Sequence, residues 1–186
     1  MLKKIKENIS PALLKFLIRI LLLIVVWKLA YHLLLKPHRF PDKPLTQITA
    51  NVTVGFVGLF YPPNTISYYG STPKNNFDLF SAIIMINGRK VVGIADPCNA
   101  LELYILFIGF LICVPTTTKR FILFSLGGIA VIFVLNILRC AGMIWVNIHR
   151  NEVFDFAHHY LFKLIVYAAI FGGWVWYSKY LTKHEQ

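Results

Sequence analysis

Three residue types in this sequence could together carry out acyl transfer. Cys98 supplies a thiol that can act as a nucleophile, and Arg139 supplies a permanent positive charge. His158 and His159 supply imidazoles, which exchange protons near neutral pH. A thiolate can attack a peptide carbonyl, an imidazole can take up and return a proton, and a guanidinium can stabilise the oxyanion that develops. This combination therefore supports acyl transfer through a cysteine nucleophile.

The residues around Cys98 predict how its thiol is presented. Asp96 and Pro97 precede it and have the form of an N-cap followed by a first-turn proline. We therefore expect Cys98 to open a helix, whose dipole would favour the thiolate. The other cysteines, Cys113 and Cys140, form neither a CxxC pair nor a metal-ligand spacing with it, so we expect no disulfide framework, no metal and no cofactor.

Two further polar residues are expected to support this site. Glu102 follows Cys98 by one helical turn and is a charge within an apolar segment, so it needs a partner such as Arg139 or Lys163. Asn136 precedes Arg139 by three residues and can form hydrogen bonds toward the same region. We interpret both, together with Asp96, as supporting residues.

The composition places these residues in a membrane. Of the 186 residues, 57% are hydrophobic and only 15% are charged, which is more apolar surface than a small soluble domain can bury. The formal net charge is +11, but most basic residues flank or interrupt apolar segments, where they contact lipid headgroups. We therefore expect membrane lipid as a partner and no nucleic acid.

Apolar segments long enough to cross a bilayer predict an all-α membrane bundle that forms a single domain over residues 1–186. The expected spans are 11–35, 98–114, 120–146 and 157–181. The long loop 36–97 contains apolar runs on both sides of Asn87-Gly88, which predicts a β-hairpin. The amphipathic stretch 46–61 could lie along the membrane surface, and a fifth span there is the alternative topology.

Basic residues predict the orientation of the spans. Clusters that would share the cytoplasmic side are Lys3, Lys4 and Lys6, then Lys119 and Arg120, then Lys179 and Lys183. Both termini are then cytoplasmic and loop 36–97 is extracytoplasmic. Arg139 follows Arg120 by 19 positions, about 28 Å of helix, which places it at the outer membrane face. Cys98 and the two histidines also fall at outer ends of spans, and this convergence favours a functional interpretation over three separate structural roles.

Three motifs, in order, resemble those of the exosortase/archaeosortase family. Ala-Asp-Pro-Cys-Asn-Ala-Leu-Glu, residues 95–102, resembles the cysteine motif, which is usually Ala-Cys-Ser-Gly-Leu or a near variant. Asn136-Ile-Leu-Arg139 resembles the Asn-x-x-Arg motif. Phe-Ala-His-His-Tyr-Leu-Phe-Lys, residues 156–163, resembles the third motif, in which a histidine opens the last conserved helix. The resemblance covers about residues 45–178.

The resemblance implies a cysteine protease/transpeptidase of the bacterial cytoplasmic (inner) membrane. Such enzymes cut secreted proteins near a C-terminal tripartite sorting signal, made of a short motif, a membrane span and a basic cluster, and pass the acyl group to an envelope acceptor. By this resemblance Cys98 is the nucleophile, Arg139 the second catalytic residue, and His158 or His159 the third. The chain has Asn99-Ala100 in place of Ser-Gly, lacks the glycine expected four residues after the histidine, and is short, as in a compact Bacteroidetes-type branch.

Two other function classes remain as alternatives. A non-enzymatic accessory or scaffold protein for envelope protein secretion would use the same polar residues only to hold its helices together. A thiol oxidoreductase is disfavoured because the cysteines form no CxxC motif.

Overall fold

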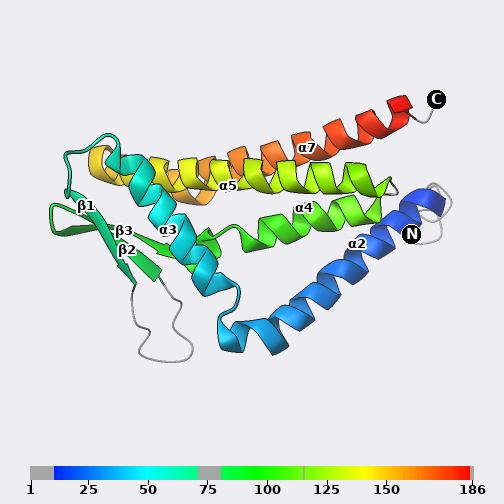
Figure 1. The fold of residues 1–186 in the computed structure, drawn as a ribbon, viewed down its shortest axis with the longest axis horizontal. Coiled ribbons are helices and arrows are strands. Elements are labelled where there is room, and N and C mark those ends of the chain that lie inside the picture. Colours follow the sequence, from blue (N-terminus) through cyan, green and yellow to red (C-terminus); the bar gives the residue numbers. More distant parts are fainter. Residues whose placement is uncertain (1–10, 71–80, 115, 185–186) are drawn as a thin grey trace.

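The structure, a computed structural model, describes residues 11–70, 81–114 and 116–184. The predicted basic cluster Lys3, Lys4 and Lys6 lies outside the described residues. The main helices are α2 (Pro11–Ala30), α3 (Asp42–Gly58), α4 (Leu101–Cys113), α5 (Thr118–His149) and α7 (Phe162–His184). Helices α4, α5 and α7 run side by side, while α3 and a small sheet lie together at one end of this bundle (Figure 1).

Three helical segments are long and apolar enough to cross a membrane: Leu14–His38, Thr118–His149 and Asn151–Lys179. They correspond to the first, third and fourth predicted spans. The second predicted span forms α4, an apolar helix of 13 residues, about 20 Å long, against a hydrocarbon core of about 30 Å. A fourth crossing at α4 therefore stays a prediction.

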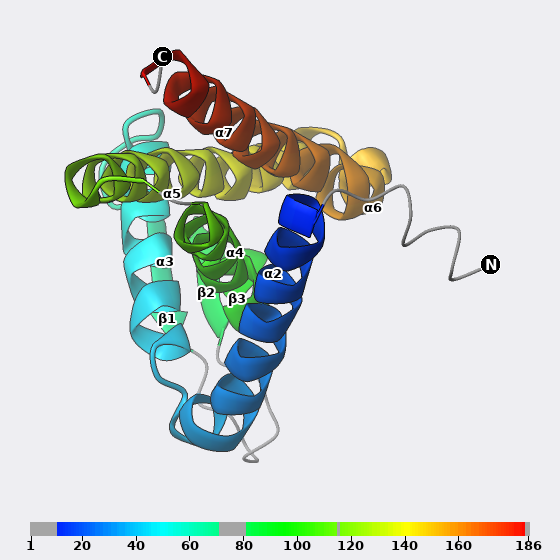
Figure 2. The same cartoon turned by 90° about the vertical axis from the view of Figure 1, so that its right-hand side faces the viewer.

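Helix α4 occupies the centre of the bundle. It packs against α2, α5 and α7, and lies between α2 and α5 when the molecule is viewed along its length (Figure 2). Phe107 of α4 is buried against Gly128 of α5, where an added Cβ would overlap the phenylalanine ring. The glycine therefore permits the close helix contact that places α4 and the turn before it against α5.

The predicted hairpin is confirmed, and a third strand extends it. Strands β1 (Ile66–Gly70), β2 (Ser81–Ile86) and β3 (Arg89–Ala95) form an antiparallel sheet in the order β1-β2-β3. Asn87 and Gly88 connect β2 to β3, both with positive φ (51° and 74°), which is the geometry that two-residue hairpin turns require. Strand β1 was not predicted.

The segment predicted as a surface stretch or fifth span forms most of helix α3, which packs on the sheet and on α5. Its buried side chains recur at helical spacing and are mainly small, namely Thr46, Thr49, Ala50, Thr53 and Val57. Among the described residues, α3 is not one of the helices long and apolar enough to cross a membrane.

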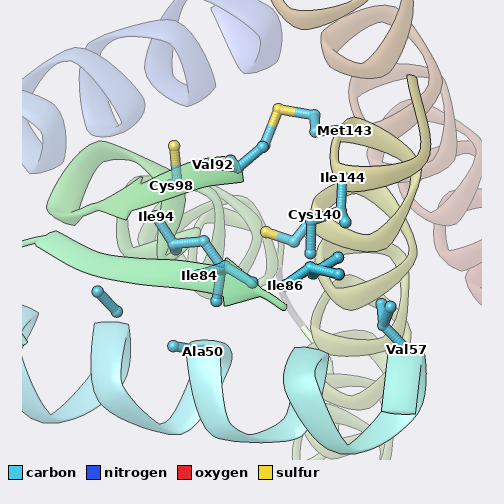
Figure 3. Close-up of a cluster of buried hydrophobic side chains, with 11 residues drawn as sticks. Ala50, Val57, Ile84, Ile86, Val92, Ile94, Cys98, Cys140, Met143 and Ile144 are labelled. Carbon is cyan, nitrogen blue, oxygen red and sulfur yellow. The ribbon is translucent and has the colours of Figure 1, made fainter. Parts of the chain in front are cut away.

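A shared core joins α3, the sheet and α5. Ala50 of α3 and Ile84 of β2 are fully buried there, and Cys140 of α5 is also fully buried in this cluster. Cys98 lies in the same cluster, with its sulfur turned away from the sheet (Figure 3). The cysteine turn is therefore anchored by packing on three elements.

Candidate active site

A pocket of about 540 Å³ opens where β3 leads into α4, and it contains three of the four predicted catalytic residues. Cys98, Arg139 and His158 all line it. They come from the turn before α4, the middle of α5 and the helical turn before α7. The structure thus brings a thiol, a guanidinium and an imidazole to one cavity from positions far apart in the sequence.

The fourth predicted residue, His159, is exposed and is not among the residues that line this pocket. Its Nδ1 lies 3.0 Å from the carbonyl oxygen of Asp155. Both histidines belong to a π-helical turn, Ala157–Leu161, and such turns re-aim side chains within a helix. Among the two candidates left open by the sequence, the pocket geometry favours His158.

Cys98 does not open an α-helix, contrary to the prediction. It ends a 3-10 turn, Asp96–Cys98, and α4 begins at Leu101. Ala100 separates the two with a left-handed backbone, φ 63°, a conformation that favours glycine. Because the effect of a helix dipole is confined to the first turn of the helix, the α4 dipole is not expected to act on the Cys98 thiol.

Hydrogen bonds from other elements hold the cysteine turn. The Asn136 side chain, fully buried on α5, donates from Nδ2 to the Cys98 carbonyl oxygen at 2.8 Å. Asp96 is buried and its Oδ1 accepts from the Thr46 hydroxyl of α3 at 2.9 Å. Of the predicted supporting residues, Asn136 therefore contacts the turn that carries the thiol, and Asp96 belongs to this turn and links it to α3.

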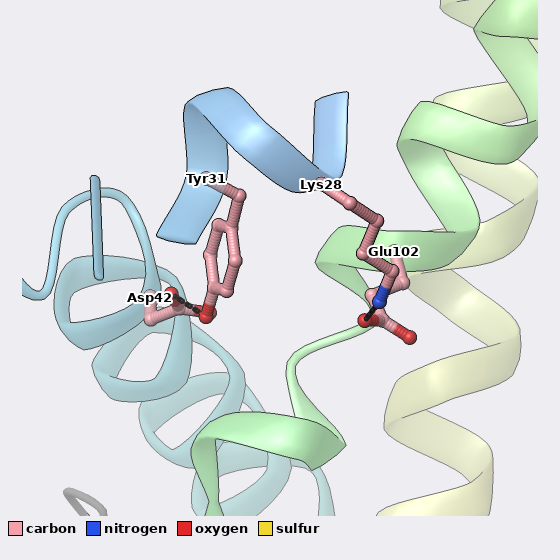
Figure 4. A network of polar contacts seen from close by, with 4 residues as sticks. All are labelled: Lys28, Tyr31, Asp42 and Glu102. Atoms are coloured by element: carbon pink, nitrogen blue, oxygen red, sulfur yellow. Dashed lines mark hydrogen bonds and ion pairs between the residues drawn. The ribbon is translucent and has the colours of Figure 1, made fainter. Parts of the chain in front are cut away.

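Asn99, the residue after the cysteine, connects this turn to α3 and, through Asp42, to the π-helical turn Tyr31–Leu35 that follows α2. Its Nδ2 donates to Asp42 Oδ1 at 2.9 Å, and its Oδ1 accepts from the Leu101 N–H at 2.9 Å. The Tyr31 hydroxyl donates to the other oxygen of Asp42 at 2.7 Å (Figure 4). Sequence reasoning missed Tyr31, Asp42 and Thr46, because no spacing links residues separated in sequence by as much as 57 positions.

Glu102 pairs with Lys28 of α2, not with Arg139 or Lys163 as predicted. The Lys28 Nζ lies 2.6 Å from Glu102 Oε1 (Figure 4). The reason is that α2 packs against α4 and brings the Lys28 ammonium to the Glu102 carboxylate. Which helix packs beside α4 was not predicted from the sequence.

Arg139 is left without such a partner. Its side chain is only 8% exposed, and its Nε is buried with no hydrogen-bond partner. Within the described residues the structure records neither an ion pair nor a hydrogen bond to this guanidinium. A buried cation in a pocket wall is costly unless something compensates it, so this arrangement suits a ligand atom that carries or develops negative charge.

His158 is also available for proton exchange. It is half-buried in the pocket wall and its ring stacks on Phe154 with 5.8 Å between centroids. No hydrogen bond to its ring nitrogens is recorded among the residues described. The pocket therefore combines a thiol, an imidazole and a guanidinium, a set that is chemically able to carry out acyl transfer.

Comparison with known proteins identifies the family. The family model described as transmembrane exosortase matches residues 10–177, which is most of the chain. No curated protein and no solved structure matches significantly. The family match agrees with the apolar helices of a multi-pass membrane protein. The chain belongs to the transmembrane exosortase family.

Proposed function

We propose that this protein is an integral-membrane cysteine transpeptidase that cleaves a C-terminal sorting signal of secreted proteins and transfers them to an envelope acceptor. The observation that carries the proposal is the unpartnered, buried guanidinium of Arg139 in a pocket that it shares with Cys98 and His158. Family membership supports the same class of reaction.

Cys98, Arg139 and His158 each have a separate role in the proposed reaction. His158 takes the proton of the Cys98 thiol, and the thiolate attacks the carbonyl carbon of the scissile peptide bond. Arg139 stabilises the oxyanion of the tetrahedral intermediate. When the C–N bond breaks, His158 returns the proton to the leaving amine and a thioester remains on Cys98. Attack by an acceptor amine or by water releases the product and restores the thiol.

The cysteine turn is positioned by residues that do not react. Asn136 holds the Cys98 carbonyl, and Asn99 ties the following residue to Asp42 of α3. Because the thiol must stay within about 3 to 3.5 Å of the carbonyl carbon during attack, fixing this backbone is expected to affect the rate more than the affinity.

The proposed orientation places the pocket on the extracytoplasmic side of the cytoplasmic membrane. Lys119 and Arg120 lie at one end of α5, while Arg139 and the sheet lie toward the other (Figure 1). The first turn of α2 and the last turns of α7 are on the Lys119 side (Figure 1). Basic residues favour the cytoplasm, so this arrangement supports two cytoplasmic termini.

The accessory or scaffold alternative fits the pocket less well. A polar residue that only holds membrane helices together is expected to contact a partner, as Lys28 and Glu102 do. Arg139 has no such contact in the part of the chain that the structure describes. Lys28 has an ion-pair partner, whereas Arg139 has none among the described residues, and this contrast favours a catalytic role for Arg139.

The test is to replace Cys98 while following a co-expressed secreted protein. Cys98→Ala and Cys98→Ser should both abolish its processing, with expression and membrane insertion unchanged. Cys113→Ala is the matched control, because this thiol is buried in α4 and does not line the pocket. Undiminished processing by both Cys98 variants would reject the transpeptidase proposal.

A further inference from the structure

We propose that the protein substrate binds as an added β-strand along the free edge of β3, with its backbone paired to Gly93 and Ala95. This inference rests on the proposed function, because it names how the peptide to be cleaved is held next to Cys98. The recognition is of the extended main chain itself, so the substrate segment beside the scissile bond must be a strand and not a helix.

Among the residues that the structure describes, strand β3 has one free edge. The sheet order is β1-β2-β3, so within the described ranges β3 pairs only with β2. The register shifts between Ile84 and Met85, which pair with Val92 and Lys90, and Val91 is the extra residue without a partner on β2. The Val91 carbonyl oxygen instead accepts a hydrogen bond from Asn147 Nδ2 of α5 at 2.6 Å. This carbonyl therefore points away from β2.

The direction of the Val91 carbonyl determines which way the backbone N–H and C=O groups of the following residues in β3 point. In a trans peptide unit the carbonyl and the next N–H point opposite ways, so the Val92 N–H faces β2. Along a regular antiparallel strand, alternate residues present both backbone polar groups to the same side. Gly93 and Ala95 consequently direct their N–H and C=O groups to the outer edge of the sheet.

This outer edge faces the candidate active-site pocket. Gly93 and Ala95 both line the cavity that contains Cys98. Gly93 is exposed, and a Cβ built on it would meet no atom within 4 Å, so there is room beside the strand. Ala95 precedes Cys98 by three residues, which span at most about 10 Å even when extended, and the 3-10 turn Asp96–Cys98 shortens this separation, so a peptide paired here reaches the thiol within a few residues.

The environment makes strand addition favourable. Unpaired backbone groups at a sheet edge are a template for another strand, and burying them in a pocket without partners is costly. A bound peptide satisfies the edge of β3 and its own backbone at once. Strand β1, at the opposite edge, contributes no residue to the pocket, so only the β3 edge brings a peptide to Cys98.

The test uses acetyl-tetraalanine chloromethyl ketone and the purified full chain in detergent micelles. Cys98 Sγ displaces chloride from the probe, forming a C–S bond, and the rate is followed by intact mass. Four analogues each carry one N-methyl group, at successive alanines. Strand pairing predicts that two alternate analogues react about fivefold to tenfold more slowly, because each loses one backbone hydrogen bond. The two intervening analogues should react as the parent does.

A second arm changes the protein. Gly93→Pro removes the N–H that points to the outer edge and leaves the hydrogen bonds between β3 and β2 intact. Prolines of this kind are tolerated in edge strands. The ratio of the tetraalanine rate to the iodoacetamide rate should fall about fivefold. An unchanged ratio overturns the proposal. If the variant does not fold, the N-methyl series on the unaltered chain still decides.

Iodoacetamide distinguishes a failure of the strand-addition proposal from a failure of the proposed function, because it reacts with the thiol and has no peptide backbone to pair with β3. If iodoacetamide labels Cys98 but the N-methyl series shows no alternation, strand addition is wrong and the proposed function stands. If neither probe reacts with Cys98 in the folded protein, the proposed function fails, and the strand proposal fails with it.

Discussion

Replacing Arg139 by methionine should stabilise the fold while abolishing processing. Arg139 is only 8% exposed, and its buried Nε has no hydrogen-bond partner. An unsatisfied buried polar group costs about 1–3 kcal/mol, and methionine keeps a stem of similar length without the charge. We therefore expect the free energy of unfolding to rise by about 1–3 kcal/mol. Loss of the oxyanion partner should reduce processing about 100-fold to 1,000-fold.

The assay compares unfolding of the purified variants in mixed micelles, by titration with a denaturing detergent, with processing in cells. Lys28→Met is the matched control, because it removes a cation that has a partner, Glu102. Both side chains of that pair are largely exposed, so its removal should lower the free energy of unfolding by no more than about 1 kcal/mol. The two substitutions should therefore change stability in opposite directions.

Two patterns of results would refute this reasoning. If Arg139→Met unfolds more readily than the wild type and still processes substrate, Arg139 is a structural residue whose interactions the pocket argument misjudged. A loss of stability together with a loss of processing would also contradict the claim that the buried Arg139 charge has no stabilising partner until the substrate binds.

Three further predictions follow from the same pocket. His158→Gln should lose processing at least 100-fold by loss of proton transfer, whereas His159→Gln should retain it, as a co-expression assay measures. A membrane-impermeant maleimide added to intact cells should label Cys98 and not Cys113, which mass spectrometry of the digested protein reports. Asn136→Leu should lower the free energy of unfolding by about 1–3 kcal/mol, because the buried Cys98 carbonyl loses its donor; an unchanged unfolding midpoint would count against that hydrogen bond.

Local patterns in the sequence were sufficient for some elements of this fold. Asn87-Gly88 predicted its hairpin because both positions need positive φ, which Asn and Gly adopt more readily than most residue types. Hydrophobic length predicted four spans, and three of them correspond to helices that are long and apolar enough to cross a membrane. The shared location of Cys98, Arg139 and His158 followed from spans that place all three near one face.

Features that depend on distant contacts could not be predicted in this way. The contacts of Asn99 with Asp42, and of Lys28 with Glu102, join α4 and the turn before it to segments whose position no local pattern encodes. The start of α4 was misplaced because Asp-Pro resembles a helix start, while the left-handed Ala100 delays the helix. The choice between two adjacent histidines depended on a π-helical turn, which has no simple sequence signature.

Trapping the acyl-enzyme tests the central claim most directly. Hydroxylamine attacks a thioester and converts the acyl group to a hydroxamate, so it should intercept the substrate attached to Cys98. We predict that a secreted protein processed in its presence ends in a hydroxamate at the cleavage site, and that Cys98→Ala yields neither cleavage nor hydroxamate. Cleavage by Cys98→Ala, or a product that ends only in a carboxylate at saturating hydroxylamine, would contradict the account.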